Sequence, residues 1–243
     1  MILEVRNIKK FFGSKKILDD INFSLNASEC LGVIGLSGCG KSTLAKIISR
    51  LIESDDGKIF LCGEEITHAT GNKFYKNMQM IFQTPEDSFD PRRNLGWSIA
   101  EPMRNYHVEN ISERVKNLLI EVGLTPEYST RYPHELSGGE CQRAAIARAI
   151  SLEPKLLISD EATSALDVTV QAQVITLLKK LCAEKNIACL FITHDLALLP
   201  RIADRVLVMH SGKIVEEGTP DEIIHSPKSP FTKKLMATDF WTM

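Results

Sequence analysis

Short apolar runs separated by polar and glycine-rich segments recur along the chain, a pattern typical of buried strands in an α/β protein. Ile21, Phe23 and Leu25 alternate with polar residues, which is the period of a half-buried strand. Five further apolar runs have the length of a strand, and they cover residues 31–34, 78–82, 156–158, 188–192 and 206–209. We expect a strand at each of these places.

Helical patterns occupy intervals between these runs. Residues 41–51 follow a glycine-rich turn and are expected to form a helix. A second predicted helix carries its apolar residues on one face, at Val170, Val174, Leu177, Leu178 and Leu181. Strand, helix and strand in this order imply parallel pairing, so the predicted core is an α/β sheet.

Residues 84–135 differ from this alternation and are predicted to form a helical lobe. Polar loops and prolines surround one clear helix, with Ser112 expected as its N-cap and Gly123 at its end. The apolar stripe of that helix consists of Val115, Leu118, Leu119 and Val122. We expect one domain over residues 1–243, with a core from residues 1–83 and 136–243 and the lobe inserted between them.

Composition narrows the classes of protein that remain. The net charge of the 243 residues is -2 and no long basic run occurs, so sequence-independent nucleic-acid binding lacks electrostatic support. The N-terminus lacks the layout of a signal peptide, and no apolar stretch approaches the roughly 20 residues that cross a bilayer. We expect a soluble protein that can dock on a membrane protein. The six cysteines form no CxxC pair, and we expect reduced, buried thiols.

A phosphate-binding loop is the strongest chemical signal in the sequence. Residues 35–43 match GxxxxGK[ST] between a predicted strand and a predicted helix, which is the context of a true P-loop. Lys41 would bind the β- and γ-phosphates, and the Ser42 hydroxyl would be a Mg²⁺ ligand. The expected nucleotide contacts are Gly35, Ser37, Gly38, Cys39, Gly40, Lys41, Ser42 and Thr43. Cys39 beside a helix N-terminus can favour the thiolate; an inert small side chain is an equally good expectation.

Two adjacent carboxylates complete a nucleotide site. Asp160 and Glu161 follow an apolar strand, at the end where ligands bind in such sheets. Asp160 would hold Mg²⁺ through a water, and Glu161 would act as general base towards the water that attacks the γ-phosphate. By itself such a pair is as often a helix N-cap, but the P-loop upstream favours the catalytic interpretation.

Several short motifs in a fixed order resemble the nucleotide-binding domain of ABC transporters, over nearly the whole chain. They are the LSGGE segment (residues 136–140), residues 164–167, His194 after ACLFIT, Gln83 after a strand, and Phe12 before a glycine. The resemblance implies a P-loop NTPase core with a mostly parallel sheet, an N-terminal antiparallel β subdomain and an inserted α-helical lobe.

The resemblance also implies roles for these residues. Gln83 would contact Mg²⁺ and the attacking water, His194 would orient the base, and Phe12 would stack on adenine. Asp167 would bridge to a partner subunit, whose bound ATP would meet Ser137, Gly138 and Gly139. Other interpretations stay open, since Phe12 can be a core aromatic, Gln83 a polar strand end, and His194 the cap of a helix that starts at Asp195.

Within the family, residues 88–96 (SFDPRRNLG) and 225–236 (HSPKSPFTKKLM) look like the oligopeptide, dipeptide and nickel importers of bacteria. The resemblance implies an ATPase that drives uptake of a peptide or a nickel or metal-chelate solute, and the chain length leans towards the metal branch. Implied partners are membrane permease subunits, a second ATP-binding subunit (a paralogue or a second copy) and, indirectly, a solute-binding protein, at the cytoplasmic face of the membrane. No nucleic acid is expected.

A soluble ABC ATPase of iron–sulfur cluster assembly is the alternative. Gln142, Arg143 and the importer-like tail argue against it. A DNA-repair ATPase of the same family would carry a long insertion in the lobe, which is missing here.

Glu140 departs from the glutamine that is commoner at the end of this segment. Ser137 and Glu140 also form the S-x-x-E pattern of a capping box. We therefore expect Glu140 to cap its own helix while the glycine amides face a phosphate.

Overall fold

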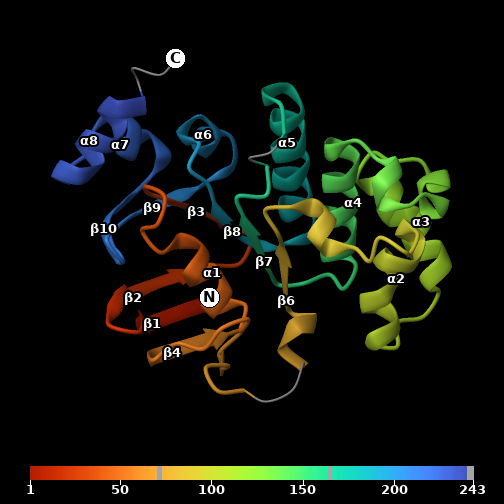
Figure 1. Cartoon of the computed structure of the whole chain (residues 1–243), viewed down its shortest axis with the longest axis horizontal. Helices are drawn as coiled ribbons and strands as arrows, with labels where there is room; N and C mark the ends of the chain where they lie inside the picture. The colour runs from red at the N-terminus through yellow and green to blue at the C-terminus, as the bar shows by residue number, and fades with distance from the viewer. Residues whose placement is uncertain (70–72, 164–165, 240–243) are drawn as a thin grey trace.

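A six-stranded sheet forms the centre of the computed structural model, which describes residues 1–69, 73–163 and 166–239 (Figure 1). Its order is β10-β9-β3-β8-β7-β6. The strands are β3 (Cys30–Ile34), β6 (Met78–Ile81), β7 (Leu156–Asp160), β8 (Ala188–Ile192), β9 (Arg205–His210) and β10 (Lys213–Gly218). All neighbours pair in parallel except β9 and β10. The predicted mostly parallel α/β sheet is confirmed.

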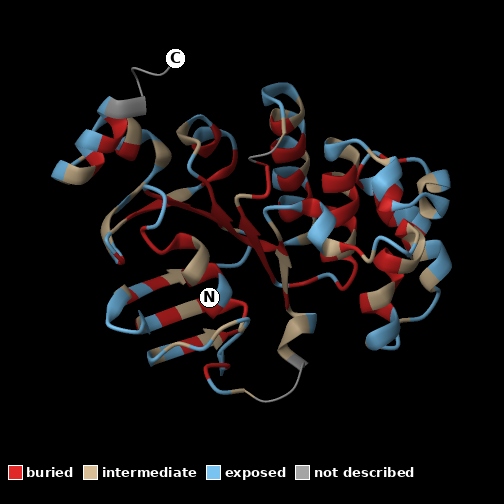
Figure 2. Cartoon of the chain, viewed as in Figure 1, coloured by how far each residue is buried: buried red, intermediate tan, exposed pale blue. Residues whose placement is uncertain are grey.

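A second sheet is antiparallel and has the order β2-β1-β4-β5. It contains β1 (Leu3–Phe12), β2 (Lys15–Leu25), β4 (Asp56–Leu61) and β5 (Glu64–Glu65). One apolar cluster joins the sheets, with Leu3 and Ile59 from this sheet and Val33 and Ile192 from the central one. Figure 2 shows the buried residues concentrated along the central strands. The expected N-terminal antiparallel β subdomain is confirmed.

The helix after the P-loop is shorter than predicted. α1 spans Lys41–Ile48 and not residues 41–51, with Ser49 as its C-cap. Arg50 has a φ of 60°, which a continuing right-handed helix cannot contain. On the other side of the central sheet lies α5 (Val168–Lys185), followed later by the short helices η5 (Leu196–Leu198) and α6 (Leu199–Ile202).

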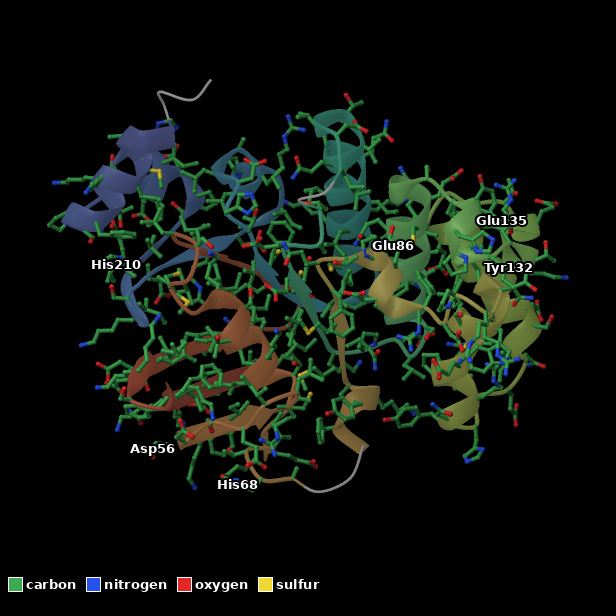
Figure 3. All side chains as sticks on the ribbon, in the orientation of Figure 1. Asp56, His68, Glu86, Tyr132, Glu135 and His210 are labelled. Carbon is green, nitrogen blue, oxygen red and sulfur yellow. The ribbon has the colours of Figure 1, made fainter. Side chains whose placement is uncertain are left out.

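Helices gather at one end of the central sheet (Figure 1). They are α2 (Leu95–Asn105), α3 (Ile111–Glu121) and α4 (Gly138–Ile150), with 3₁₀ turns η1 (Lys73–Lys76), η2 (Pro85–Ser88), η3 (Pro126–Thr130) and η4 (Pro133–Glu135). The predicted stripe of α3 is buried, but its N-cap is Asn110, and Ser112 lies inside the helix. In η4 the Tyr132 amide donates to Glu135 (2.6 Å), at the outer side of this helical region (Figure 3). That residues 84–135 act as a separate lobe stays a prediction.

The C-terminal segment packs against the β9–β10 hairpin. It contains α7 (Pro220–His225) and α8 (Pro230–Asp239). The Glu216 carboxylate accepts the amides of Lys228 (2.7 Å) and Ser229 (2.9 Å), just before α8 begins. The Phe231 ring stacks on His210 with centroids 3.8 Å apart, where Figure 3 shows His210 beside the C-terminal helices.

All six cysteines are free, as expected, but Cys62 is exposed whereas the other five are buried. Across the described ranges 1–69, 73–163 and 166–239, no helix combines the length and apolar character needed to span a bilayer.

Candidate functional site

The P-loop connects β3 to α1 and is fixed from behind by β9. Gly35 has a φ of 152°, and a Cβ there would lie 2.2 Å from the Met209 carbonyl oxygen, so only glycine fits. α1 begins at Lys41 after Gly40, and no side chain caps it in the described structure. The amides of its first turn therefore have no acceptor within the helix and point to where an anion can bind.

Lys41 places a buried cation in this loop. Its side chain is 4 % exposed, and Nζ donates to the carbonyl oxygens of Gly35 (2.7 Å) and Leu36 (3.3 Å). The same Nζ lies 3.9 Å from Glu161 Oε1. A phosphate can compete for this ammonium, because the two carbonyls are neutral acceptors and a phosphate oxygen is charged.

Asp160 ends β7 next to the start of α1. Ser42 Oγ donates to Asp160 Oδ1 at 3.0 Å, and Asp160 is 7 % exposed. Burial raises the pKa of the Asp160 carboxyl above its usual value, because the hydroxyl compensates the desolvated charge only in part. A buried, under-compensated carboxylate beside a hydroxyl is a donor set that suits Mg²⁺. Of the residues predicted to hold the metal, Ser42 and Asp160 therefore fit a cation here.

Glu161 adopts a backbone conformation that is uncommon for its residue type. Its φ is 48°, and its amide donates to the Ile192 carbonyl of β8 at 3.0 Å. A left-handed residue other than glycine costs free energy and persists where the surrounding structure holds it, often at functional sites. The sequence did not indicate this left-handed turn.

Gln83 and His194 converge on the Glu161 carboxylate from two other strands. Gln83 Nε2 donates to Glu161 Oε2 at 3.4 Å, and His194 Nδ1 lies 3.3 Å from the same oxygen. His194 is not the cap of the following helix, because Asp195 is the N-cap of η5 and accepts the Ala197 amide (2.9 Å). The three residues predicted to be catalytic thus lie together at the carboxyl ends of parallel strands.

Phe12 ends β1 and is 54 % exposed, so it is not the core aromatic of the alternative interpretation. Lys10 Nζ lies 5.6 Å from its ring centroid.

Asp167 is the N-cap of α5 and accepts the Val170 amide at 3.0 Å. Ser164 and Ala165, in the motif that ends at Asp167, lie outside the described residues.

The LSGGE segment begins α4 with the predicted capping box, which is confirmed. The Glu140 amide donates to Ser137 Oγ (3.4 Å), while the Ser137 amide and hydroxyl donate to Glu140 Oε2 (each 2.8 Å). Tyr128 donates to Glu140 Oε1, and this hydrogen bond is the main reason why the pKa of Glu140 lies below its usual value. In the described structure, no hydrogen bond or ion pair joins Ser137, Gly138 or Gly139 to the P-loop of the same chain.

Comparison with known proteins agrees with this arrangement. The model of the ABC transporter family matches residues 18–164, more than half of the chain. The chain belongs to the ABC transporter family.

Similar proteins within this ABC family are ATP-binding subunits named for oligopeptide transport. The oligopeptide transport ATP-binding protein OppF of Salmonella typhimurium is 44% identical, and the match covers 98% of this chain and 77% of that protein. The corresponding AppF of Bacillus subtilis is 42% identical over 98% of this chain and 78% of its own length. The solved structure of cbiO1 from Clostridium perfringens, part of the cbiONQ ABC transporter complex, is 26% identical with a TM-score of 0.84, covering 100% of this chain and 95% of that one.

The chain is therefore an ABC ATPase that binds and hydrolyses ATP in transport across a membrane. These relatives give no support to the iron–sulfur cluster alternative. Within the ABC site, burial raises the pKa of the Cys39 thiol, which is 7 % exposed. This favours the interpretation of Cys39 as an inert small side chain over that of a thiolate.

Proposed function

We propose that this ABC ATPase drives uptake of a peptide through membrane permease subunits, working at their cytoplasmic face. The observation that carries the catalytic part is the convergence of Gln83 and His194 on Glu161 beside the P-loop. The relatives that are oligopeptide transport ATP-binding proteins support a peptide rather than nickel or a metal chelate. An extracytoplasmic solute-binding protein would select the solute, because the site described here is built for ATP.

Different residues of the site would bind the adenine, the phosphates and the Mg²⁺ of ATP. Phe12 would stack on adenine, and the P-loop amides with Lys41 would bind the β- and γ-phosphates. Lys41 would exchange the carbonyls of Gly35 and Leu36 for phosphate oxygens. Mg²⁺, held by Ser42 and Asp160 and approached by Gln83, would offset phosphate charge.

Glu161 would accept a proton from the attacking water as general base. His194, already 3.3 Å from Glu161 Oε2, would hold that carboxylate in position and reach the γ-phosphate. Gln83, which follows β6 and precedes the helical region, would report the position of the permease to the same carboxylate.

A second ATP-binding subunit would complete each site. Ser137 caps α4, which begins at Gly138 and Gly139. The amides of these two glycines lie in the first turn of the helix, where a partner's γ-phosphate would bind. Asp167 would contact that partner. Two subunits closing around two ATP molecules would move the permease, and hydrolysis would reopen them.

Two experiments test this proposal. Lys41→Ala should abolish binding of a fluorescent ATP analogue, and unchanged binding would refute the assigned phosphate site. For the solute, a strain that lacks this chain should lose accumulation of a labelled tripeptide and keep that of ⁶³Ni²⁺; the plasmid-borne wild type, but not Lys41→Ala, should restore peptide uptake. Loss of nickel uptake alone would favour the metal branch.

A further inference from the structure

Gly139, the second glycine of the LSGGE segment, lies against a side chain of the neighbouring helix. A Cβ on Gly139 would lie 2.6 Å from Val170 Cγ1, which is closer than any real contact allows. Gly139 lies within the first turn of α4, and no positive φ demands glycine there. What demands glycine is the approach of α5.

Two further contacts place the starts of α4 and α5 side by side. A Cβ on Gly138 would lie 3.3 Å from Leu166 Cδ2, a tight contact. One turn later, Arg143 Nη2 donates to Gln173 Oε1 at 3.3 Å. Leu166 and Val170 are half-buried and pack on the large apolar cluster, and Figure 1 shows the two helices adjacent.

We propose that Val170 is a positioning residue for the ATPase reaction, which fixes the LSGGE loop from behind through Gly139. The inference rests on the proposed function, in which this loop meets the partner's γ-phosphate. The Val170 amide donates to Asp167 Oδ1 at 3.0 Å, so the same residue is also held by the N-cap of α5. Because Val170 Cγ1 fills the space where a Cβ would lie, the glycine lets the loop sit on α5, with its amides turned to the phosphate.

The account predicts a rescue. In the purified full chain assembled with its second ATP-binding subunit, Gly139→Ala forces the loop away from Val170 and should lower kcat for ATP hydrolysis by about tenfold or more. Val170→Ala removes the Cγ1 atom that the new Cβ meets. The double variant, which combines Gly139→Ala and Val170→Ala, should therefore recover at least about a third of the decrease in log kcat that Gly139→Ala causes. Affinity of the P-loop for a fluorescent ATP analogue should stay unchanged in all three variants.

Val168 is the matched control, because it lies in the same helix and is 81% exposed. Gly139→Ala with Val168→Ala should show no recovery. If the Val170 double variant recovers nothing, or the Val168 variant recovers as much, the inference is wrong. Should Gly139→Ala fail to fold, Val170→Ala alone is decisive, with an expected two- to fivefold loss of kcat at unchanged ATP affinity; an unchanged kcat would overturn the inference.

Ser137→Ala separates this inference from the proposed function. Ser137 belongs to the same loop but pairs with Glu140 and not with Val170, so its loss tests the loop independently of the Gly139–Val170 contact. If Ser137→Ala leaves ATP hydrolysis unchanged, the composite site fails, and the inference fails with it. If Ser137→Ala lowers kcat and the double variant shows no rescue, only the role of Val170 fails.

Discussion

The Tyr128 hydroxyl donates a hydrogen bond to the Glu140 carboxylate, so the acid at the end of the LSGGE segment is held by its own subunit. The other oxygen of Glu140 accepts the amide and the hydroxyl of Ser137. Both carboxylate oxygens are therefore engaged at the N-terminus of α4, where the helix favours negative charge. This arrangement explains how an acid is tolerated beside the place proposed for a phosphate.

Glu140→Gln should change ATPase activity by less than about tenfold, or about 1.4 kcal/mol. The amide oxygen of glutamine can still accept the Ser137 amide, and its NH₂ group can donate to the Tyr128 oxygen. The measurement is kcat/KM for ATP. Glu140→Ala is the control, because it removes the carboxylate half of the capping box and should lower stability by up to about 1 kcal/mol. A change beyond tenfold for Glu140→Gln would show that the acid acts on the nucleotide.

Asp160→Asn should raise the melting temperature of the nucleotide-free protein at pH 7 by on the order of a few degrees. Because burial raises the pKa of Asp160 in the folded state, the folded chain holds this proton more tightly than the unfolded chain. The protonated Asp160 carboxyl therefore makes its full contribution to the free energy of unfolding below the usual pKa of 3.8. This contribution is lost as the pH rises through the higher pKa that the group has in the folded chain. The gain from Asp160→Asn should shrink as the pH falls towards 4.

Asp56→Asn is a control for the Asp160→Asn experiment, because the pKa of Asp56 is shifted in the opposite direction. A hydrogen bond from Lys9 lowers the pKa of this exposed carboxyl, which lies at the start of β4 and is labelled in Figure 3. Asp56→Asn should lower the melting temperature slightly at pH 7 and have no effect well below pH 3.8. If Asp160→Asn is less stable than wild type at pH 7 as well as near pH 4, the proposed effect of burial on Asp160 is wrong.

Cys39 should react slowly with iodoacetamide at pH 7.5, and Cys62 should react first. Burial raises the pKa of the Cys39 thiol and restricts access to it, whereas Cys62 is exposed. In Cys62→Ser, the remaining slow labelling of Cys39 should increase with pH and be slowed further by ATP. Peptide mapping by mass spectrometry measures both rates. Equal labelling of Cys39 with and without ATP would argue against a nucleotide over this loop.

His194→Ala should lower kcat by on the order of 10–100-fold while ATP still binds to the P-loop, because the Glu161 carboxylate loses the group that orients it. Asp195→Ala is a neighbouring control: Asp195 caps η5 and has no contact with Glu161 in the described structure. Its effect on kcat should be much smaller. A His194→Ala variant with normal kcat would remove His194 from the mechanism.

The sequence predicted five of the six strands of the central sheet and the α4 capping box, because apolar runs and cap chemistry are local properties. β10 (Lys213–Gly218) was not predicted, since its sequence is mostly polar and contains no apolar run of strand length. The predicted end of α1 and the predicted start of α3 were wrong, because a residue with a left-handed backbone conformation lies next to each and the composition does not reveal it. α1 ends before Arg50, which takes a left-handed conformation, and α3 begins one residue before Ser112, after a left-handed Asn110.

Long-range contacts could not be predicted in the same way. Tyr128 meets Glu140 only because η3 packs beside the start of α4, and nothing in the spacing of the two residues signals it. Val170 appeared in the apolar stripe of α5, but its contact with Gly139 depends on how α4 lies against α5. Burial likewise opposes a thiolate at Cys39, since desolvation raises the pKa of this thiol more than the charge of Lys41 and nearby backbone hydrogen bonds lower it.

Nucleotide content of Glu161→Gln after incubation with Mg²⁺ and ATP tests the central claim, that Glu161 is the general base of this site, most directly. The account predicts that the variant binds ATP as wild type does and still holds ATP, not ADP, after wild type has converted its nucleotide completely. It also predicts that ATP traps Glu161→Gln in the closed complex with its partner subunit. Conversion of ATP to ADP at the wild-type rate would contradict the account.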